Sequence, residues 1–281
     1  MLDESRAIPE DALADIAYLA RSSNRVEILA TLATEPHASR DVAAATAASR
    51  STLERILTEL EERGWAERTT DGTYVATPAG EFAISKFVPL VGAMQAIRSL
   101  GDAVGWLPAD ELSIGLHHFR DATVSRPESN SPLAPDTQLV GMIREADSFH
   151  CLVRIAPSVA FENAVRDAVV EGNLTTEHVL TDGEHASLSE RRDRLEHWRE
   201  YLEAGANVYR YDDRIPCNLF VLDDAVFLAN RQPETCAFIV TENERVRSWA
   251  RHVIETYRRE ADRLDATAFS EESSTLANSN R

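Results

Sequence analysis

Residues 49–81 read SRSTLERILTELEERGWAERTTDGTYVATPAGE, and this stretch decides the fold of the first part of the chain. Its apolar residues recur at the spacing i, i+3, i+4, i+7, which places them on one face of an amphipathic helix. They are Leu53, Ile56, Leu57 and Leu60. Gly64 is suited to end this helix, and Asp71-Gly72 between two β-prone runs predicts a hairpin.

Three short helices are expected before this one, over about 9–20, 23–35 and 39–46. The residues Ala-Ala-Ser at 47–49 then form a turn into the amphipathic helix. Either Ser49 or Ser51 can cap it, and Ser51 with Glu54 also fits a capping box. Short helices, a tight turn, a helix and a hairpin in this order predict a winged helix-turn-helix over residues 1–80.

The N-terminal half of the amphipathic helix carries side chains suited to DNA. A helix in the major groove reads base edges with its N-terminal residues, and Arg can bond to guanine with two donors. The candidate DNA-binding residues are Arg40, Ser49, Arg50, Ser51, Thr52 and Arg55 on the helices, with Thr70 and Thr73 at the wing. Residues 37–55 hold three arginines against two acids, whereas acids dominate the C-terminal half of the helix. The alternative interpretation is an ordinary amphipathic helix with a solvated face.

The chain is strongly acidic, with 29 basic and 47 acidic residues and a formal net charge of −18. Lys86 is its single lysine, so the remaining basic residues are all arginine. Many carboxylates with almost no lysine favour a halophilic cytoplasmic protein over a generic acidic one. In salt of about 1 M the Debye length is roughly 3 Å, so only charges at a contact would influence DNA binding.

The middle of the chain is expected to connect two domains. Residues 78–106 form a helical stretch with apolar residues near heptad spacing, and Pro89 should break or kink it early. This stripe serves either as intramolecular packing or as the seam of a homodimer. Residues 81–119 are therefore predicted as connecting or dimerisation helices, and the proline- and serine-rich residues 120–136 as a loop or linker.

Residues 137–265 change to alternating helices and strands, which predicts an α/β effector domain with a mixed sheet. The final helix is expected over 243–264, and the small, polar residues 266–281 are expected to be a disordered tail. The chain as a whole is thus assigned to the α+β class. No apolar run is long enough to cross a bilayer, and the acidic N-terminus lacks the features of a signal peptide.

Residues 20–80 resemble the winged helix-turn-helix of archaeal transcription regulators, in the recognition helix, the wing and the Thr-Pro-x-Gly exit at 77–80. Residues 100–265 resemble the middle domain of methanogenesis regulators, on three segments: WLPADEL (106–112), NLFVLDDAVFLAN (218–230) and WARHVIETYRREAD (249–262). The layout is also similar to the sugar-sensing TrmB-like regulators, whose effector domains resemble half of a phospholipase D. The resemblance implies DNA binding coupled to a domain that senses a ligand or partner.

No catalytic site, cofactor or metal is predicted. Phospholipase D chemistry needs a His-x-Lys-x4-Asp pattern, which is absent, and no Gly-x-Ser-x-Gly elbow occurs. The pairs His117-His118 and Asp223-Asp224 favour turns or surface sites over acid–base or metal chemistry, and Cys151, Cys217 and Cys236 favour buried reduced thiols. Arg154, Asn218 and Arg231 are candidate effector-binding residues because they lie in or beside strands, although positions on an edge strand or the surface are the commoner explanation for such residues.

These patterns predict a cytoplasmic, sequence-specific transcription regulator that binds double-stranded DNA as a homodimer and senses a small molecule or a partner. Two other classes are compatible with the sequence. One is a winged helix used for protein contact without DNA, and the other is an enzyme with an appended winged helix.

Overall fold

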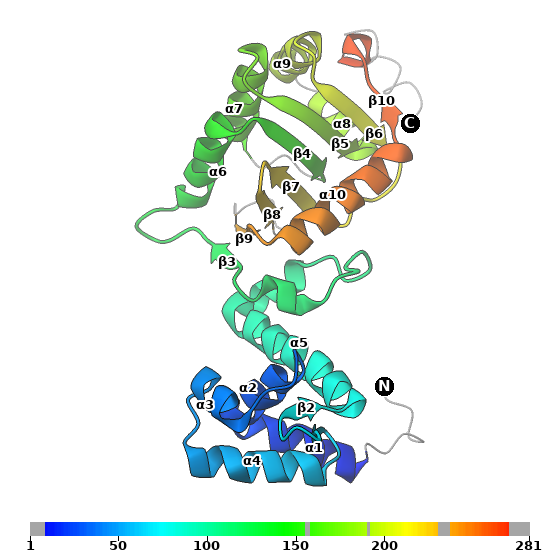
Figure 1. Ribbon diagram of the computed structural model, residues 1–281. Helices are drawn as coiled ribbons and strands as arrows, with labels where there is room; N and C mark the ends of the chain where they lie inside the picture. The colour runs from blue at the N-terminus through cyan, green and yellow to red at the C-terminus, as the bar shows by residue number, and fades with distance from the viewer. Residues whose placement is uncertain (1–8, 155–157, 190–191, 230–236, 270–281) are drawn as a thin grey trace. The chain divides into compact units, whose positions relative to one another are not determined.

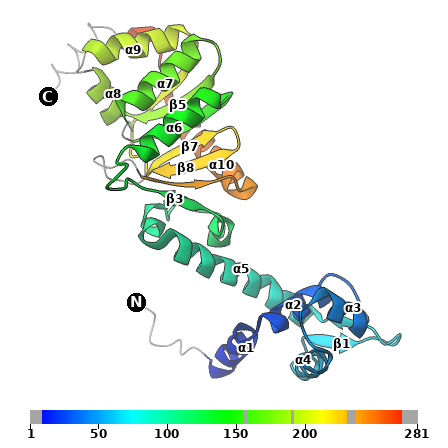
Figure 2. The same cartoon turned by 90° about the vertical axis from the view of Figure 1, so that its left-hand side faces the viewer.

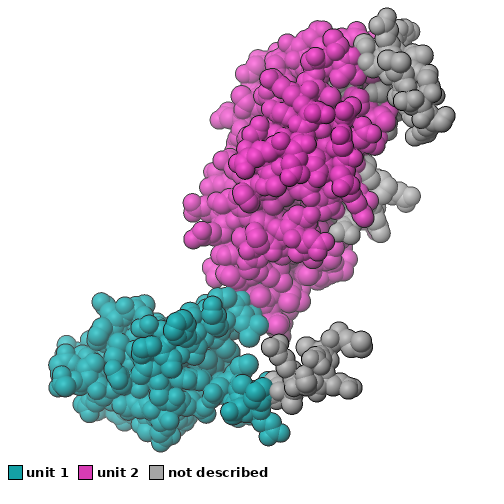
Figure 3. Space-filling model, turned by 90° about the vertical axis from the view of Figure 1, so that its right-hand side faces the viewer, with its two compact units in different colours: residues 1–92 teal, residues 93–281 magenta. Residues whose placement is uncertain are grey.

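The computed structural model describes residues 9–154, 158–189, 192–229 and 237–269 (Figure 1). The chain divides into two compact units, residues 1–92 and residues 93–281, which are coloured separately in Figure 3. Each unit has its own buried core. The α+β class predicted from the sequence is confirmed.

The first unit is a winged helix-turn-helix. Its elements are α1 (Glu10–Ala20), α2 (Ser23–Leu32), α3 (Ser39–Ala45), α4 (Arg50–Glu62), β1 (Ala66–Arg68), β2 (Tyr74–Ala76) and the start of α5 (Pro78–Leu100). The four apolar residues of α4 are buried against Ile28, Leu29 and Leu32 of α2. Strands β1 and β2 pair antiparallel and form the wing, with Asp71-Gly72 between them.

The exit from the wing explains the sequence Thr77-Pro78-Ala79-Gly80. The Thr77 hydroxyl donates to the carbonyl oxygen of Gly64 at 2.6 Å and accepts from the Gly80 N–H at 3.2 Å, which joins the end of the α4 segment to the start of α5. Gly80 lies so close to Trp65 that a Cβ atom would stand 2.0 Å from the Trp65 carbonyl oxygen. Only glycine fits at this crossing.

The second unit is built on an eight-stranded mixed sheet within the described residues, with the order β10-β6-β5-β4-β7-β8-β9-β3. Strands β4, β5 and β6 are parallel, and the other neighbours are antiparallel. The strands are β3 (Thr123–Ser125), β4 (Ser148–Val153), β5 (Thr175–Thr181), β6 (Asn207–Tyr211), β7 (Asn218–Leu222), β8 (Ala225–Ala229), β9 (Phe238–Thr241) and β10 (Asp262–Arg263).

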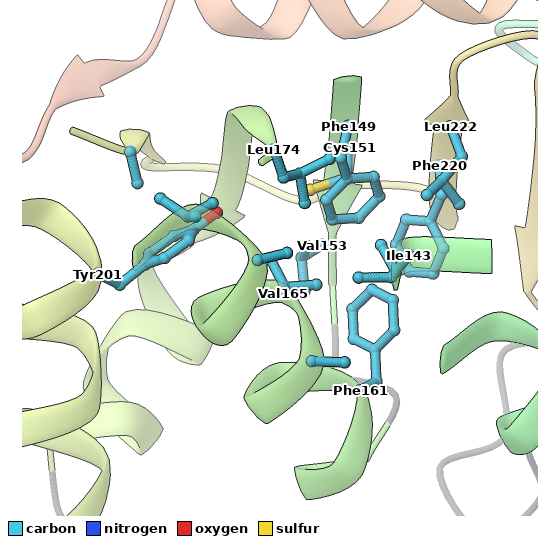
Figure 4. Close-up of a cluster of buried hydrophobic side chains, with 14 of the residues drawn as sticks. Ile143, Phe149, Cys151, Val153, Phe161, Val165, Leu174, Tyr201, Phe220 and Leu222 are labelled. Atoms are coloured by element: carbon cyan, nitrogen blue, oxygen red, sulfur yellow. The ribbon is translucent and has the colours of Figure 1, made fainter. Parts of the chain in front are cut away.

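Helices cover both faces of this sheet (Figures 1 and 2). The helices are α6 (Ala134–Glu145), α7 (Val159–Val170), α8 (Asp182–Ser189), α9 (Arg192–Glu203) and α10 (Glu244–Arg259). Residues of α6, α7 and α9 form one core with Phe149, Cys151 and Phe220 of the sheet (Figure 4). On the other face α10 packs together with residues 96–122, including the short 3-10 helices η1 (Gly101–Trp106) and η2 (Leu116–Phe119).

Several boundaries differ from those expected. Residues 96–119 of the expected connecting segment 81–119 contribute Ala96, Leu100, Leu107 and Phe119 to the core of the second unit. The expected linker 120–136 contains β3, which pairs with β9, and the expected domain start at 137 falls inside α6. Buried apolar residues 96–122 are needed to cover the second face of the sheet, and a linker would leave that face open to water.

Three other expectations about local structure are corrected. Of the break or kink expected at Pro89, the break does not occur, because α5 continues through this residue. The final helix ends at Arg259 rather than near 264, because β10 then pairs with β6, and residues 266–269 of the expected tail form the 3-10 helix η3 (Ala266–Phe269). In the part of the chain that the structure describes, no helix is both long and apolar enough to span a membrane.

Candidate DNA-binding surface and effector pocket

The N-terminus of α4 is fixed by Ser49 rather than by Ser51. The Ser49 hydroxyl accepts from the Thr52 N–H at 3.3 Å and lies 2.9 Å from the Thr52 hydroxyl. It also lies 3.2 Å from the Ser51 hydroxyl, so the three candidate hydroxyl groups form one chain across the first turn. This chain presents exposed hydroxyl groups beside Arg50, at the end of the helix where free N–H groups favour phosphate.

Both candidate arginines of α4 are paired with glutamates one turn further along the helix. Arg50 Nε lies 3.0 Å from Glu54 Oε1, and the Arg50 side chain is 90% exposed. Arg55 Nη1 lies 2.5 Å from Glu59 Oε1. The acids of α4 are therefore not all separated from its arginines along the helix. Glu54 and Glu59 instead bind the arginines that were predicted to read DNA.

The two pairs differ in how firmly they are held. Glu59 also accepts from Arg25 of α2 at 3.2 Å, and Arg25 donates to the carbonyl oxygen of Tyr18 at 2.9 Å. Burial would raise the pKa of Glu59, but the hydrogen bond from Arg55 and the nearby positive charges of Arg55 and Arg25 outweigh it and lower the pKa. Arg55 is thus tied through Glu59 to the scaffold, whereas the Arg50–Glu54 pair is attached only to its own helix.

The remaining candidates for DNA contact lie apart from α4. Arg40 on α3 has a side chain 87% exposed and contacts only its neighbour Asp41, at 3.3 Å between Nε and Oδ1. Thr70 is exposed at the wing tip. The Thr73 hydroxyl is engaged within the wing, since it donates to Asp71 at 3.0 Å and lies 2.7 Å from the Thr69 hydroxyl.

Two of the three candidate effector residues lie within the described part of the chain. Arg154 and Asn218 do meet, but through the Arg154 backbone N–H, which donates to Asn218 Oδ1 at 2.7 Å. Asn218 is buried and joins the ends of β4 and β7. Arg231 lies outside the described residues.

A small cavity of about 30 Å³ lies between the sheet and helices α7 and α9. Its lining is mostly apolar, and Figure 4 shows Val153, Val165, Phe161 and Tyr201 around this part of the core. The other lining residues are Glu162, His178, Leu180, Glu184, His197 and Trp198. An open groove of about 530 Å³ between α7 and α9 shares Glu162 and His197 with the cavity.

A polar chain runs along the sheet side of the cavity. Tyr201 donates to the Thr176 hydroxyl at 2.8 Å, and its oxygen lies 3.0 Å from His178 Nδ1. Burial alone lowers the pKa of His178 to about 3, so its imidazole is neutral at physiological pH. At the opening, the carboxylate of Glu162 pairs with Arg194, which links α7 to α9.

Sequence reasoning missed this pocket, although one signal was available. Thr176, His178 and Leu180 alternate along β5, so all three point to the same face. That face is the one covered by α7 and α9, and the first two of these residues are polar and buried. Polar residues at the inward positions of a buried strand need partners, and here they find Tyr201.

The paired aspartates, the cysteines and the paired histidines noted in the sequence are the remaining candidates for a site. Asp223-Asp224 forms the two-residue turn between β7 and β8, as expected. Cys151 and Cys217 are buried, and Cys236 lies outside the described residues. The ring centroids of His117 and His118 lie 4.0 Å apart with the rings tilted by 39°, and no group of three or more metal-binding side chains occurs among the described residues.

Two family models match the chain. Residues 13–99 match the HVO_A0261 N-terminal domain, and residues 132–260 match the middle domain of the methanogenesis regulatory protein FilR1. The resemblance stated from the sequence is therefore confirmed, with one match in the N-terminal part of the chain and one within residues 93–281. No curated protein sequence gives a significant match.

Solved structures with similarity to the chain include TrmBL2, an archaeal chromatin protein, with 16% identity over 85% of this chain and 92% of that chain and a TM-score of 0.39. The phospholipase D family member Nuc from Salmonella typhimurium has 12% identity over 51% of this chain and 99% of that chain, with a TM-score of 0.42. NucT from Helicobacter pylori has 12% identity over 51% and 98%, with a TM-score of 0.41.

Proposed function

We propose that this chain, in which an HVO_A0261 N-terminal domain precedes a FilR1 middle domain, is a sequence-specific DNA-binding transcription regulator. The observation that carries the proposal is helix α4. Its apolar face is fully buried in the winged helix-turn-helix, and its other face presents Arg50 and Arg55 with the hydroxyl groups of the first turn. This is the arrangement that a recognition helix needs in a major groove.

The test is binding to promoter DNA identified by genome-wide footprinting, measured by gel shift at the salt concentration of the native cytoplasm. Arg55→Ala should weaken specific binding about 5- to 150-fold, the value of one good guanine contact of roughly 1–3 kcal/mol. Arg144→Ala is the matched control, because Arg144 is an exposed arginine on α6 in the second unit. Normal binding by both Arg50→Ala and Arg55→Ala would remove α4 as the recognition helix.

We also propose a homodimer that forms through α5. This helix exposes Val88, Leu90, Val91, Met94 and Ile97, and residues 82–101 contain no acidic residue. In a chain of net charge −18, the acid-free apolar stretch 82–100 of this helix is the surface on which a second copy can pack without repulsion between carboxylates.

Sedimentation of the full chain tests this dimer. Met94→Glu should shift the protein towards monomer, because it places a carboxylate in the apolar stripe. Leu133→Glu is the control, since Leu133 is 69% exposed and stands at the N-terminus of α6, where an acid is tolerated. A monomeric wild-type protein at working salt would exclude the dimer.

For residues 93–281 we propose a binding role, in which a small molecule or partner changes how the DNA-binding domains are presented. The cavity between α7 and α9 supports this proposal, because it combines apolar walls with a few polar groups, as ligand sites do. A purely protein-contacting winged helix would give no promoter footprint, and an enzyme would show turnover with metabolites.

A further inference from the structure

The cavity between α7 and α9 is lined by a hydrogen-bonding atom, His178 Nε2, for which the described residues provide no hydrogen-bond partner. His178 is only 4% exposed and lines the cavity. Its Nδ1 lies 3.0 Å from the hydroxyl oxygen of Tyr201, and Nε2 is the other polar atom of the ring. Because this nitrogen belongs to a residue almost entirely removed from solvent and lines the cavity, a ligand gains a hydrogen bond there.

The hydrogen bonds around Tyr201 decide which kind of partner Nε2 accepts. Since Tyr201 donates its one hydroxyl proton to Thr176, the proton between Tyr201 and His178 must come from His178 Nδ1. A neutral imidazole with its proton on Nδ1 has a lone pair on Nε2. The ligand must therefore bring a donor, such as an O–H or N–H group.

The side chains that line the cavity determine which shape and which charge a ligand can have. Phe161, Val165, Leu180 and Trp198 offer apolar and aromatic surface, which suits a flat ring. Burial disfavours a charged His178, and Glu162 already pairs with Arg194 at the opening. A charged ligand would lose its hydration here without a counter-charge at His178, so the buried part is neutral.

We propose that the second unit binds a small uncharged aromatic molecule with one hydrogen-bond donor, of the phenol or indole class, with the donor on His178 Nε2. This deepens the proposed effector role of residues 93–281 and rests on it. The cavity of about 30 Å³ has room for only one or two water molecules. A ring therefore enters from the groove and separates α7 from α9 at the Glu162–Arg194 pair, which links occupancy to a change in the domain.

The experiment is calorimetric titration of the full-length protein with four probes: phenol, indole, toluene and benzoate. Phenol and indole should bind. Toluene, which has the ring without the donor, should bind about 2- to 10-fold more weakly than phenol, the value of one net hydrogen bond. Benzoate should not bind measurably. Equal affinities for phenol and toluene, or tighter binding of benzoate, would overturn the proposal.

The variant His178→Phe keeps the size of the side chain and removes Nε2. It should lower the affinity for phenol to that for toluene and leave toluene binding unchanged. Val165→Phe, which fills the cavity, should abolish binding of both probes and keeps the test valid if the His178 variant does not fold. Promoter binding without probes separates the two proposals: a protein that binds its promoter but no probe retains the regulator role and loses this ligand class.

Discussion

Replacing Gly80 with alanine tests whether the crossing of α5 over the wing holds the DNA-binding unit together. Gly80 is the last residue of the Thr-Pro-x-Gly exit, and a Cβ atom there would lie 2.0 Å from the Trp65 carbonyl oxygen and 2.9 Å from its carbonyl carbon. Both atoms belong to the backbone, so neither can rotate away. Because Cβ atoms do not approach other heavy atoms within 3.0 Å, the two segments must separate by about 1 Å.

The cost of this separation can be estimated from two contributions. Forcing an extra methyl group into a packed site costs about 1–3 kcal/mol, and the upper value applies where backbone has to move. The Trp65 carbonyl also accepts from the Thr77 N–H at 3.0 Å, and weakening that bond adds about 1 kcal/mol. We expect Gly80→Ala to destabilise the first unit by about 3–4 kcal/mol, a large share of the stability of an ordinary domain.

Gly64→Ala is the matched control within the same unit. A Cβ atom on Gly64 would meet nothing within 4 Å, but its φ of +69° is unfavourable for alanine. The cost there is conformational only, about 1–2 kcal/mol. The comparison therefore separates a steric clash from a backbone preference.

The assay is amide hydrogen exchange of the full-length protein at molar salt, read on peptides from residues 50–76. A loss of 3–4 kcal/mol should speed exchange in α4 and the wing by about two to three orders of magnitude, against roughly tenfold for Gly64→Ala. Exchange in Gly80→Ala no faster than in Gly64→Ala would refute the reasoning, because the crossing would then have room for a side chain.

Three further predictions concern the second unit. Asp223→Ala should cost about 3 kcal/mol in urea unfolding, because the Asp223 carboxylate accepts two bonds of 2.9 Å from the start of β4, while Asp224→Ala should cost less than about 0.5 kcal/mol. The hydrogen bond from Arg258 lowers the pKa of Glu255 to about 2, so Glu255→Gln should destabilise the protein above pH 4.5 and lose this effect as the pH falls towards 2. Burial lowers the pKa of His178 to about 3, so as the pH falls this imidazole is protonated in the unfolded chain before it is protonated in the folded protein. The free energy of unfolding of the wild-type protein should therefore fall by about 2 kcal/mol from pH 6.5 to 5. His178→Phe should lack that part of the decline, and an unchanged pH profile would contradict the buried neutral imidazole.

The winged helix-turn-helix was predictable because its signals are local. The apolar spacing in α4, the glycine after it and the Asp-Gly turn each specify a conformation within a few residues. The choice of Ser49 over Ser51 as the cap was left open, since both positions satisfy the same pattern. The alternation of helices and strands over residues 137–265 was also predicted.

The elements that were missed depend on distant partners. Strand β3 has three residues and exists because β9 offers it a free edge, and β10 has two residues paired with β6. Nothing in the sequence of either segment distinguishes it from a loop. The same holds for the pocket: His178 and Tyr201 are 23 residues apart, and only the packing of α9 on β5 brings their polar atoms together.

The paired arginines change how an acidic protein can bind DNA. The sequence suggested that basic and acidic residues of α4 separate along the helix, yet Arg50 and Arg55 each bind a glutamate. On contact with DNA, each arginine would exchange a carboxylate for a phosphate or a guanine edge. That exchange replaces one anionic or polar partner of the arginine with another. The net gain in binding free energy is therefore small for any DNA and depends on how well the new partner fits the arginine. Glu54 releases Arg50 easily, because both are exposed, whereas Glu59 is held by Arg25 and keeps Arg55 in one orientation. The glutamates that seem to oppose DNA binding would thus weaken non-specific contacts most, and the firmly held Arg55 would discriminate between base pairs more strongly than Arg50.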